Sequence, residues 1–219
     1  AKKLGLGART GIQLKGEKPG LIPSTQWKKK AKNEPWFPGE TISASIGQGY
    51  NLITPLQSAS MISTVANGGF LVRPYLVKKI EDSEGKVIQE FFPTVVRNVH
   101  MDPEILKHLK EGLRGVVHEP HGTGYRARLK NIVVSGKTGT AQVVGMKDSE
   151  NIDSEDETPY SFRDHAWFVA YAPYEKPEIA VSVIVEHGGH GGAVAAPIAR
   201  KILKSYFTHY PPVKVLESG

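Results

Sequence analysis

The sequence predicts an α+β fold in which helices cover an antiparallel sheet. Apolar, β-branched runs at 131–144, 165–172 and 178–186 predict three strands, and the short connection between the last two favours antiparallel neighbours. Helix-period patterns occur both before and after these runs. The chain has 219 residues and no visible internal repeat, so we expect one domain that spans 1–219.

Composition excludes several classes of protein. Hydrophobic residues make up 39% of the chain and charged residues 23%, which is typical of a globular domain. No apolar run approaches the roughly 18 residues of a membrane span, and the first residues lack the apolar segment of a signal peptide. The chain has no cysteine, which excludes disulfides and thiolate zinc sites. We expect no cofactor and no metal ion.

The basic character of the chain does not indicate nucleic-acid binding. The net charge is +6, and the clearest cluster of cations is Lys28–Lys30 with Lys32. Prolines flank this cluster, and no aromatic-rich strand accompanies it. We therefore expect a solvated loop, or a loop near anionic lipid or cell wall, and no nucleic-acid partner.

In chain order, the first predicted helix begins near Thr54. The segment 15–45 before it is rich in proline and lacks periodicity, so it is predicted to be irregular. Thr54 is a hydroxyl N-cap, Pro55 suits the first helical position, and Gln57 completes a capping box. Gly68 and Gly69 end the helix. Its predicted inward residues are Leu56, Ala59, Ile62 and Ala66, with Met61 and Val65 widening the face.

A hairpin and a second helix follow. The runs Tyr75–Ile80 and Lys86–Phe91 flank the turn Asp82–Gly85, which predicts a β-hairpin. Asp102 and Pro103 then open a helix whose core-facing residues are predicted to be Ile105, Leu109, Leu113 and Val116 or Val117. His118–His121 resembles a metal-binding helix motif one residue short, but the proline inside it forbids that helix.

The central strand carries the polar segment around which the chain is organised. Between two apolar runs lie one cation, Lys137, and three hydroxyls, Ser135, Thr138 and Thr140. In an extended chain Thr138 and Thr140 share one face, and Lys137 and Gly139 share the other unless a bulge re-aims them. Hydroxyls and N–H groups beside an ammonium suit the binding of a carboxylate.

A phosphate-binding Walker A loop is the alternative for Gly136-Lys137-Thr138. That motif needs a glycine five residues before Gly136, where this chain has Asn131. It also needs a helix that starts at Lys137, whereas Gly139, Thr140 and two valines follow and favour a strand. An NTPase is therefore the less favoured interpretation.

The last part of the chain is predicted to hold a loop, two strands and a helix. Residues 145–163 are rich in Asp, Glu and Ser, which predicts a mobile loop beside the central strand. The His187–Gly192 segment suggests a metal site, but its four glycines favour a glycine turn into the last helix. That helix is predicted at Ala195–Phe207, with Ile198, Ile202 and Tyr206 inward and Arg200, Lys201 and Lys204 outward.

The sequence resembles a known enzyme family at several places. Ser135–Gln142 resembles the third signature motif, K-T-G, of penicillin-recognising serine acyltransferases. The segments that precede K-T-G in class B penicillin-binding proteins resemble Ser45–Tyr50, Ile53–Gln57 and Ala66–Gly69. Two further segments, Gly20–Ser24 and Pro35–Gly39, are most similar to the cell-elongation transpeptidases of the penicillin-binding protein 2 type. The similarity runs from about residue 3 to about residue 207.

This resemblance implies a fold, a reaction and site residues. The fold is the C-terminal portion of a penicillin-binding transpeptidase domain. The reaction is the cross-linking of peptidoglycan, in which a serine attacks a D-Ala-D-Ala carbonyl to form an acyl-enzyme, and β-lactams acylate the same serine. Lys137 would favour anions and assist proton transfer, and the Thr140 N–H would stabilise the oxyanion. Substrate binding would involve Ser135, Gly136, Thr138 and Gly139.

The resemblance also implies what this chain does not carry. The family's S-x-x-K and S-x-N motifs precede the region that resembles 1–14, so the nucleophile is expected upstream. Ser83–Lys86 and Ser149–Asn151 match these patterns, but they lie in a predicted turn and in the acidic loop, and we reject both. We expect an inactive fragment; a non-catalytic cell-wall or partner-binding module is the alternative.

Location and partners follow from the resemblance alone. It implies an extracytoplasmic domain of a protein anchored in the inner membrane, with the anchor before Ala1. The expected partners are peptidoglycan stem peptides, β-lactams, a SEDS-family glycosyltransferase and the elongation machinery.

Overall fold

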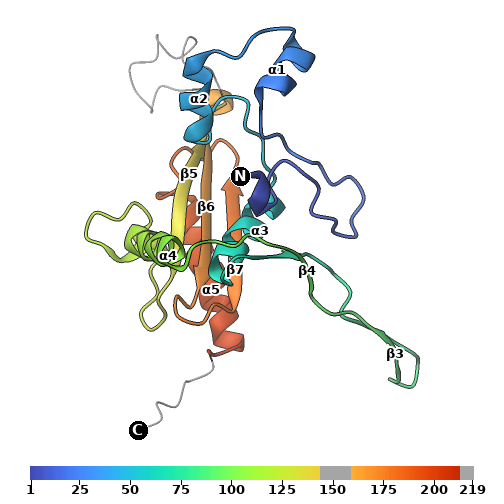
Figure 1. Ribbon diagram of the computed structural model, residues 1–219. Helices are drawn as coiled ribbons and strands as arrows, with labels where there is room; N and C mark the ends of the chain where they lie inside the picture. Colours follow the sequence, from blue (N-terminus) through green and yellow to red (C-terminus); the bar gives the residue numbers. More distant parts are fainter. Residues whose placement is uncertain (144–158, 213–219) are drawn as a thin grey trace. The chain divides into compact units, whose positions relative to one another are not determined.

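The computed structural model describes residues 1–143 and 159–212 and divides the chain into two compact units, Ala1–Met101 and Asp102–Gly219. The loop predicted at 145–163 therefore lies mostly outside the described residues. The elements of the first unit are a 3-10 turn η1 (Lys2–Leu4), α1 (Thr25–Lys32), α2 (Pro38–Ser45), α3 (Pro55–Ala66), β1 (Phe70–Arg73), β2 (Lys79–Glu81), β3 (Val87–Glu90) and β4 (Thr94–Asn98) (Figure 1).

Helix α3 confirms the capping prediction. The Thr54 hydroxyl accepts a hydrogen bond from the Gln57 N–H at 3.1 Å, and the Gln57 side chain accepts one from the Thr54 N–H at 3.0 Å. Of the predicted inward residues, Ile62, Val65 and Ala66 are buried. Gln57 is also buried, because its amide reaches back to the carbonyls of Ala8 and Pro19 at 2.6 and 2.8 Å.

The prediction of an irregular segment at 15–45 was wrong, because two short helices form there. Ser24 caps α1 by accepting a hydrogen bond from the Trp27 N–H, and Pro38 begins α2. Lys28 of α1 is buried rather than solvated. Its ammonium lies 2.5 Å from the Glu40 carboxylate of α2 and 3.4 Å from that of Glu34.

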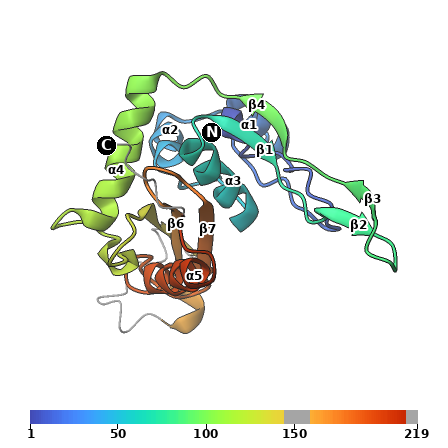
Figure 2. The ribbon, with the colours of Figure 1, turned by 90° about the horizontal axis from the view of Figure 1, so that it is seen from below.

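The predicted hairpin is confirmed in its centre and is part of a longer arm. Strands β2 and β3 pair in antiparallel fashion around the turn at Asp82, although residues 75–78 are not in a strand. Strands β1 and β4, a pair that the sequence analysis did not predict, form a second two-stranded sheet. Both views draw these pairs as successive parts of one ribbon arm (Figures 1 and 2).

The second unit is built on the antiparallel sheet that the sequence predicts. Its elements are α4 (Pro103–His118), the 3-10 turn η2 (Tyr125–Ala127), β5 (Ser135–Ala141), the 3-10 turn η4 (Tyr160–Phe162), β6 (His165–Ala172), β7 (Ile179–Val185) and α5 (Ala195–His209). The strand order is β5-β6-β7, so β6 is central (Figure 1). Helix α5 packs on β6 and β7 (Figure 2). Helix α4 packs on β5.

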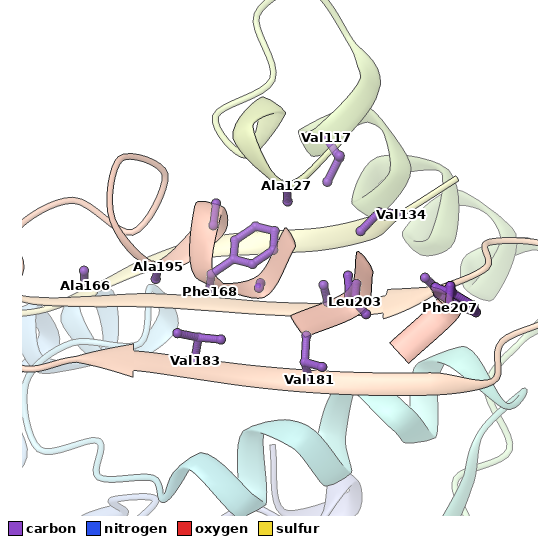
Figure 3. Packing of buried hydrophobic residues seen from close by; sticks show 14 residues of the cluster. Val117, Ala127, Val134, Ala166, Phe168, Val181, Val183, Ala195, Leu203 and Phe207 are labelled. Atoms are coloured by element: carbon purple, nitrogen blue, oxygen red, sulfur yellow. The ribbon is translucent and has the colours of Figure 1, made fainter. Parts of the chain in front are cut away.

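One hydrophobic core holds this unit together. Phe168, Ala170, Val181 and Val183 project from one face of β6 and β7. Leu203 and the other inward residues of α5 cover them (Figure 3). Val117 at the end of α4 and Val134 before β5 extend the same cluster. The core therefore determines which face of β5 lies on the same side of the sheet as Phe168 and Val183.

Of the residues predicted to face inward on α5, Tyr206 is partly buried and packs against the core, whereas the prediction for Ile198 and Ile202 was wrong by one residue in rotation. Ile198 and Ile202 are 37% and 43% exposed, whereas Ala195, Ala199, Leu203 and Phe207 are buried. The small alanines let the helix lie close to the sheet, which places the bulkier isoleucines at the side. The cations predicted to face outward are exposed, namely Arg200, Lys201 and Lys204.

Helix α4 has the predicted start and part of the predicted face. The Asp102 side chain caps it by accepting from the Glu104 N–H at 2.8 Å, and it ends at His118, before Pro120. Leu113 and Val117 are buried as predicted, but Ile105 and Leu109 are 65% and 41% exposed. The amphipathic pattern therefore extends further along the helix than its buried face.

Candidate functional site

Strand β5 presents its two threonine hydroxyls on one face. The register between β5 and β6 is unbroken, with Thr138 opposite Phe168 and Thr140 opposite Ala166. Because side chains alternate along a strand, both threonines lie on the face that carries Phe168, which is the face of the core. Lys137 and Gly139 lie on the other face, which confirms the predicted alternation.

The two threonines open into a hollow of about 350 Å³, here called the threonine hollow. Its walls come from β5, from the turn at η2 and from the loop that precedes α5. Thr123 Oγ1 lies 2.9 Å from Thr138 Oγ1, so the turn and the strand are joined by a hydrogen bond inside the hollow. The lining residues are Thr123, Tyr125, Arg126, Thr138, Thr140, His190, Gly191, Gly192 and Ala193.

The cation of this hollow comes from η2. Arg126 donates from Nη1 to the carbonyl oxygen of Ala193 and from Nε to the Tyr125 hydroxyl, both at 3.2 Å. These two bonds hold the guanidinium plane between η2 and the loop before α5. Hydroxyls on one wall and a fixed guanidinium on another form an arrangement that can bind a carboxylate.

Glycines let the loop before α5 approach the strand closely. A Cβ atom on Gly191 would lie 2.1 Å from the Trp167 carbonyl oxygen and 2.5 Å from that of Gly139. A Cβ on Gly192 would lie 2.2 Å from the carbonyl oxygen of Thr123. The segment at 187–192 is thus the glycine turn into α5 that the sequence favoured. The described residues hold no group of three side chains able to bind a metal ion.

The remaining predicted site residues lie outside the threonine hollow. Lys137 is exposed, and its ammonium donates to the Thr138 carbonyl oxygen at 2.8 Å. Ser135 is fully buried. Gly136 packs so tightly that a Cβ would lie 2.5 Å from the Val169 carbonyl oxygen. The roles predicted for these residues and for Gly139 stay predictions.

A histidine fixes the start of β5. The Val134 N–H donates to His118 Nε2 at 3.2 Å, which ties the end of α4 to the strand. Burial lowers the pKa of His118 below its ordinary value, and the charges of Arg128 and Arg114 lower it further. The neutral form that accepts this hydrogen bond is therefore favoured.

Sequence reasoning missed Thr123 and Arg126. They precede Lys137 by 14 and 11 residues, and neither belongs to a recognisable sequence motif. Thr123 stands between Gly122 and Gly124, in a stretch from 121 to 143 that contains four Lys or Arg and no carboxylate. That local excess of cations is the sequence signal that could have identified this wall.

The structure argues against a Walker A loop and against Ser83 as the nucleophile. Lys137 and Thr138 lie in a strand, so the helix that a Walker A loop requires is not formed. Ser83 lies in the turn between β2 and β3, where the predicted hairpin places it, while Ser149 lies outside the described residues. In the described part of the chain, no helix has the length and hydrophobicity to cross a bilayer.

A family model and curated relatives both match almost the whole chain. The family model of the penicillin binding protein transpeptidase domain matches residues 1–204. A peptidoglycan D,D-transpeptidase MrdA from Haemophilus influenzae is 38% identical over 214 residues, which cover 96% of this chain and 32% of that protein. MrdA from Escherichia coli is 36% identical, with 92% and 31% covered. The chain thus spans about a third of the length of these relatives.

The solved structures that match this chain are also penicillin-binding proteins. In a complex of penicillin-binding protein PBP2 and MreC from Helicobacter pylori, the matching chain has a TM-score of 0.75 at 31% identity and covers 95% of this chain. PBP2 of Pseudomonas aeruginosa in complex with WCK 5153 has a TM-score of 0.75 at 35% identity and covers 94%. The match extends over 35% and 42% of those chains.

Proposed function

This chain belongs to the penicillin-binding protein transpeptidase domain family, and on that premise we propose that it forms the carboxylate-binding wall of a peptidoglycan D,D-transpeptidase. The observation that carries the proposal is the placement of Thr138 and Thr140, whose hydroxyls share one face of β5 and line the threonine hollow. The substrate would be a stem peptide that ends in D-Ala-D-Ala, attacked by a serine to give an acyl-enzyme.

Each residue of the motif has a proposed part in this reaction. Thr138 and Thr140 donate hydroxyl hydrogen bonds to the substrate carboxylate, and the Thr140 N–H stabilises the oxyanion. Lys137 raises the local positive potential and assists proton transfer. Gly139 lets the substrate approach the strand. Ser135 and Gly136 act from inside the sheet, where they hold the strand in place beneath the substrate.

The same premise supports proposals on location and partners. The domain would act outside the cytoplasm, as part of a protein anchored in the inner membrane. It would bind β-lactams and work with the elongation machinery, including a SEDS-family glycosyltransferase. The Helicobacter pylori PBP2 structure, a complex with MreC, supports an elongation partner of this kind.

Acylation by a fluorescent penicillin tests the proposed function. In the longest natural protein that contains this sequence, Thr138→Val, Thr140→Val and Lys137→Ala should each slow acylation by about 100-fold or more, because each removes a donor or charge that acts on the transition state. Thr208→Val is the matched control, since Thr208 is an exposed threonine of α5 far along the helix from the threonine hollow. It should leave the rate unchanged.

The 219-residue chain by itself should not be acylated. Its S-x-x-K match, Ser83–Lys86, lies in a hairpin turn and lacks the helix start that activates such a serine. A covalent penicillin adduct on Ser83 would contradict this. Binding of stem peptides with no acylation in the longest natural protein would favour a non-catalytic wall-binding module instead.

A further inference from the structure

We propose that Arg126 is a substrate-recognition residue that binds the terminal carboxylate of the peptide, and that Thr123 is the positioning residue of Thr138. The inference rests on the proposed function and deepens it. It names the side chains that would make the site select a free C-terminal carboxylate over a neutral C-terminus.

The geometry of the threonine hollow is the first support. Arg126 lines the same hollow as Thr138 and Thr140. Its two hydrogen bonds use Nε and Nη1, and neither goes to an anion. Nη2 makes no hydrogen bond with any other residue that the structure describes. A guanidinium that is already oriented loses little freedom when it binds a planar carboxylate.

The charge distribution along the walls is the second support. Nine residues line the hollow. Arg126 supplies a cation among them, and none of the nine is Asp or Glu. With no carboxylate in the lining, the positive charge of Arg126 is available to a ligand. Helix α5 also begins just after Ala193, so the positive end of its dipole lies beside the hollow.

Close packing of the η2 turn is the third support. A Cβ on Gly122 would lie 2.4 Å from the Val116 carbonyl oxygen, and one on Gly124 would lie 2.9 Å from Phe168 Cε2. The turn is therefore pressed against α4 and the core on both sides of Thr123. This rigid support is what a recognition group needs to hold its position.

Thr123 acts through Thr138. The two hydroxyls are 2.9 Å apart, and a hydroxyl that exchanges one hydrogen bond with a neighbour has a restricted rotor. When Thr123 donates to Thr138, the Thr138 proton is left to point at the anion. Thr123 needs no contact with the substrate for this effect.

A purely structural role for Arg126 is the competing explanation. The bond to the Ala193 carbonyl already ties η2 to the loop before α5, and this could be its whole purpose. In that case replacing Arg126 lowers stability and slows all substrates alike. Selectivity between a charged and a neutral C-terminus separates the two explanations.

The experiment uses two peptides that differ only at the C-terminus. One ends in D-Ala-D-Ala with a free carboxylate, and the other ends in the corresponding amide. In the longest natural protein that contains this sequence, kcat/KM is measured from the release of D-alanine or D-alaninamide. Arg126→Gln should lower kcat/KM for the carboxylate peptide by about 10- to 100-fold and leave the amide peptide nearly unchanged.

Three further variants sharpen the test. Arg126→Lys keeps the positive charge but loses the planar guanidinium that can donate two parallel hydrogen bonds. It should lower kcat/KM about 3- to 10-fold for the carboxylate peptide alone. It is also the second variant should Arg126→Gln fold poorly, which a thermal unfolding curve reports. Thr123→Val should lower kcat/KM for the carboxylate peptide by a similar factor. Thr123→Ser keeps the hydroxyl and should keep kcat/KM near that of the unaltered protein.

Arg200→Gln is the matched control. Arg200 is exposed on α5 and lines a neighbouring hollow of about 540 Å³, so its loss removes one positive charge but no donor of the threonine hollow. It should change selectivity by less than about 2-fold, as expected for a screened surface charge. Unchanged selectivity in the Arg126 variants, or an equal loss in Arg200→Gln, would overturn the inference. If the unaltered protein releases neither product, the proposed function fails and the inference falls with it.

Discussion

The two compact units of this chain bury different kinds of side chain. Among the described residues, the fully buried polar side chains of the first unit are Lys28, Gln57, Ser58 and Thr64, whereas the second unit has Ser135 and the hydroxyl of Tyr171. The buried hydrophobic residues show the opposite distribution, since most of them belong to the core around β6, β7 and α5. The first unit therefore depends on polar links, and the second depends on packing.

The polar links of the first unit join segments that are far apart in sequence. Gln57 of α3 binds the carbonyls of Ala8 and Pro19. Lys28 of α1 binds Glu40 of α2 and lies 4.4 Å from the centre of the Phe37 ring. Burial alone would lower the pKa of Lys28, but the hydrogen bonds to Glu40 and Glu34 raise it above its ordinary value. Such links specify how loops meet, since each donor needs one acceptor.

The largest effect is expected from the core of the second unit. Phe168 is fully buried between the sheet and its helices, so Phe168→Ala should lower the free energy of unfolding by about 3–5 kcal/mol. Denaturant unfolding gives the size of the change. Hydrogen exchange should show the loss of protection in β5, β6 and β7. Phe162→Ala is the control, since Phe162 is 46% exposed, and an equal effect there would contradict a packing origin.

A smaller but still substantial effect is expected from the polar links. Gln57→Leu keeps the approximate volume but leaves the carbonyls of Ala8 and Pro19 and the Thr54 N–H without this partner. We expect a loss of about 2–3 kcal/mol. Exchange should accelerate at the Leu21 and Leu52 amides, which bridge nearby segments. Gln13→Leu, at an exposed position, should cost far less; an effect as large as that of Gln57→Leu would refute the role of the links.

The elements that the sequence predicted well are those with local causes. Strand β6 has the predicted bounds, His165–Ala172, and α3 begins at the predicted N-cap. Both follow from patterns within a few residues, namely β-branched and aromatic content in one case and a capping box in the other. The alternation of Thr138 and Thr140 on β5 is local in the same sense, because the strand has no bulge.

The failures have non-local causes. The buried face of α5 depends on how closely alanines allow the helix to approach the sheet, which the periodicity of Ile198 and Ile202 cannot indicate. Lys28 can be buried because its ammonium pairs with the carboxylates of Glu34 and Glu40, which come later in the sequence. The lysine cluster by itself does not reveal these partners and suggests a solvated surface.

The candidate site divides in the same way. The strand residues were predicted because the motif is continuous in sequence. Thr123 and Arg126 were not, because the turn at η2 and the loop before α5 meet only in the folded chain. Tight glycine contacts bring these segments together, and a single sequence does not show which glycines have a neighbour.

The smallest expected effect separates the two units by pH. His118 in the second unit has a pKa below its ordinary value of 6.5, so its contribution is fully present above about pH 6.5 and is lost as pH falls through the lowered pKa. In the first unit the Glu40 carboxylate, bonded to Lys28 and to the Phe37 N–H, has a pKa below 4.5 and loses its contribution only in more acidic solution. Between pH 8 and pH 5 the second unit should therefore change alone.

His118→Gln keeps an acceptor for the Val134 N–H but does not titrate. Urea midpoints should run parallel for the two proteins above about pH 6.5. Below it the unaltered protein should lose stability relative to the variant, by at most about 1.4 kcal/mol per pH unit for one proton. Parallel midpoints down to pH 5, with an unshifted Val134 amide in an NMR titration, would show that the bond to His118 does not hold the start of β5.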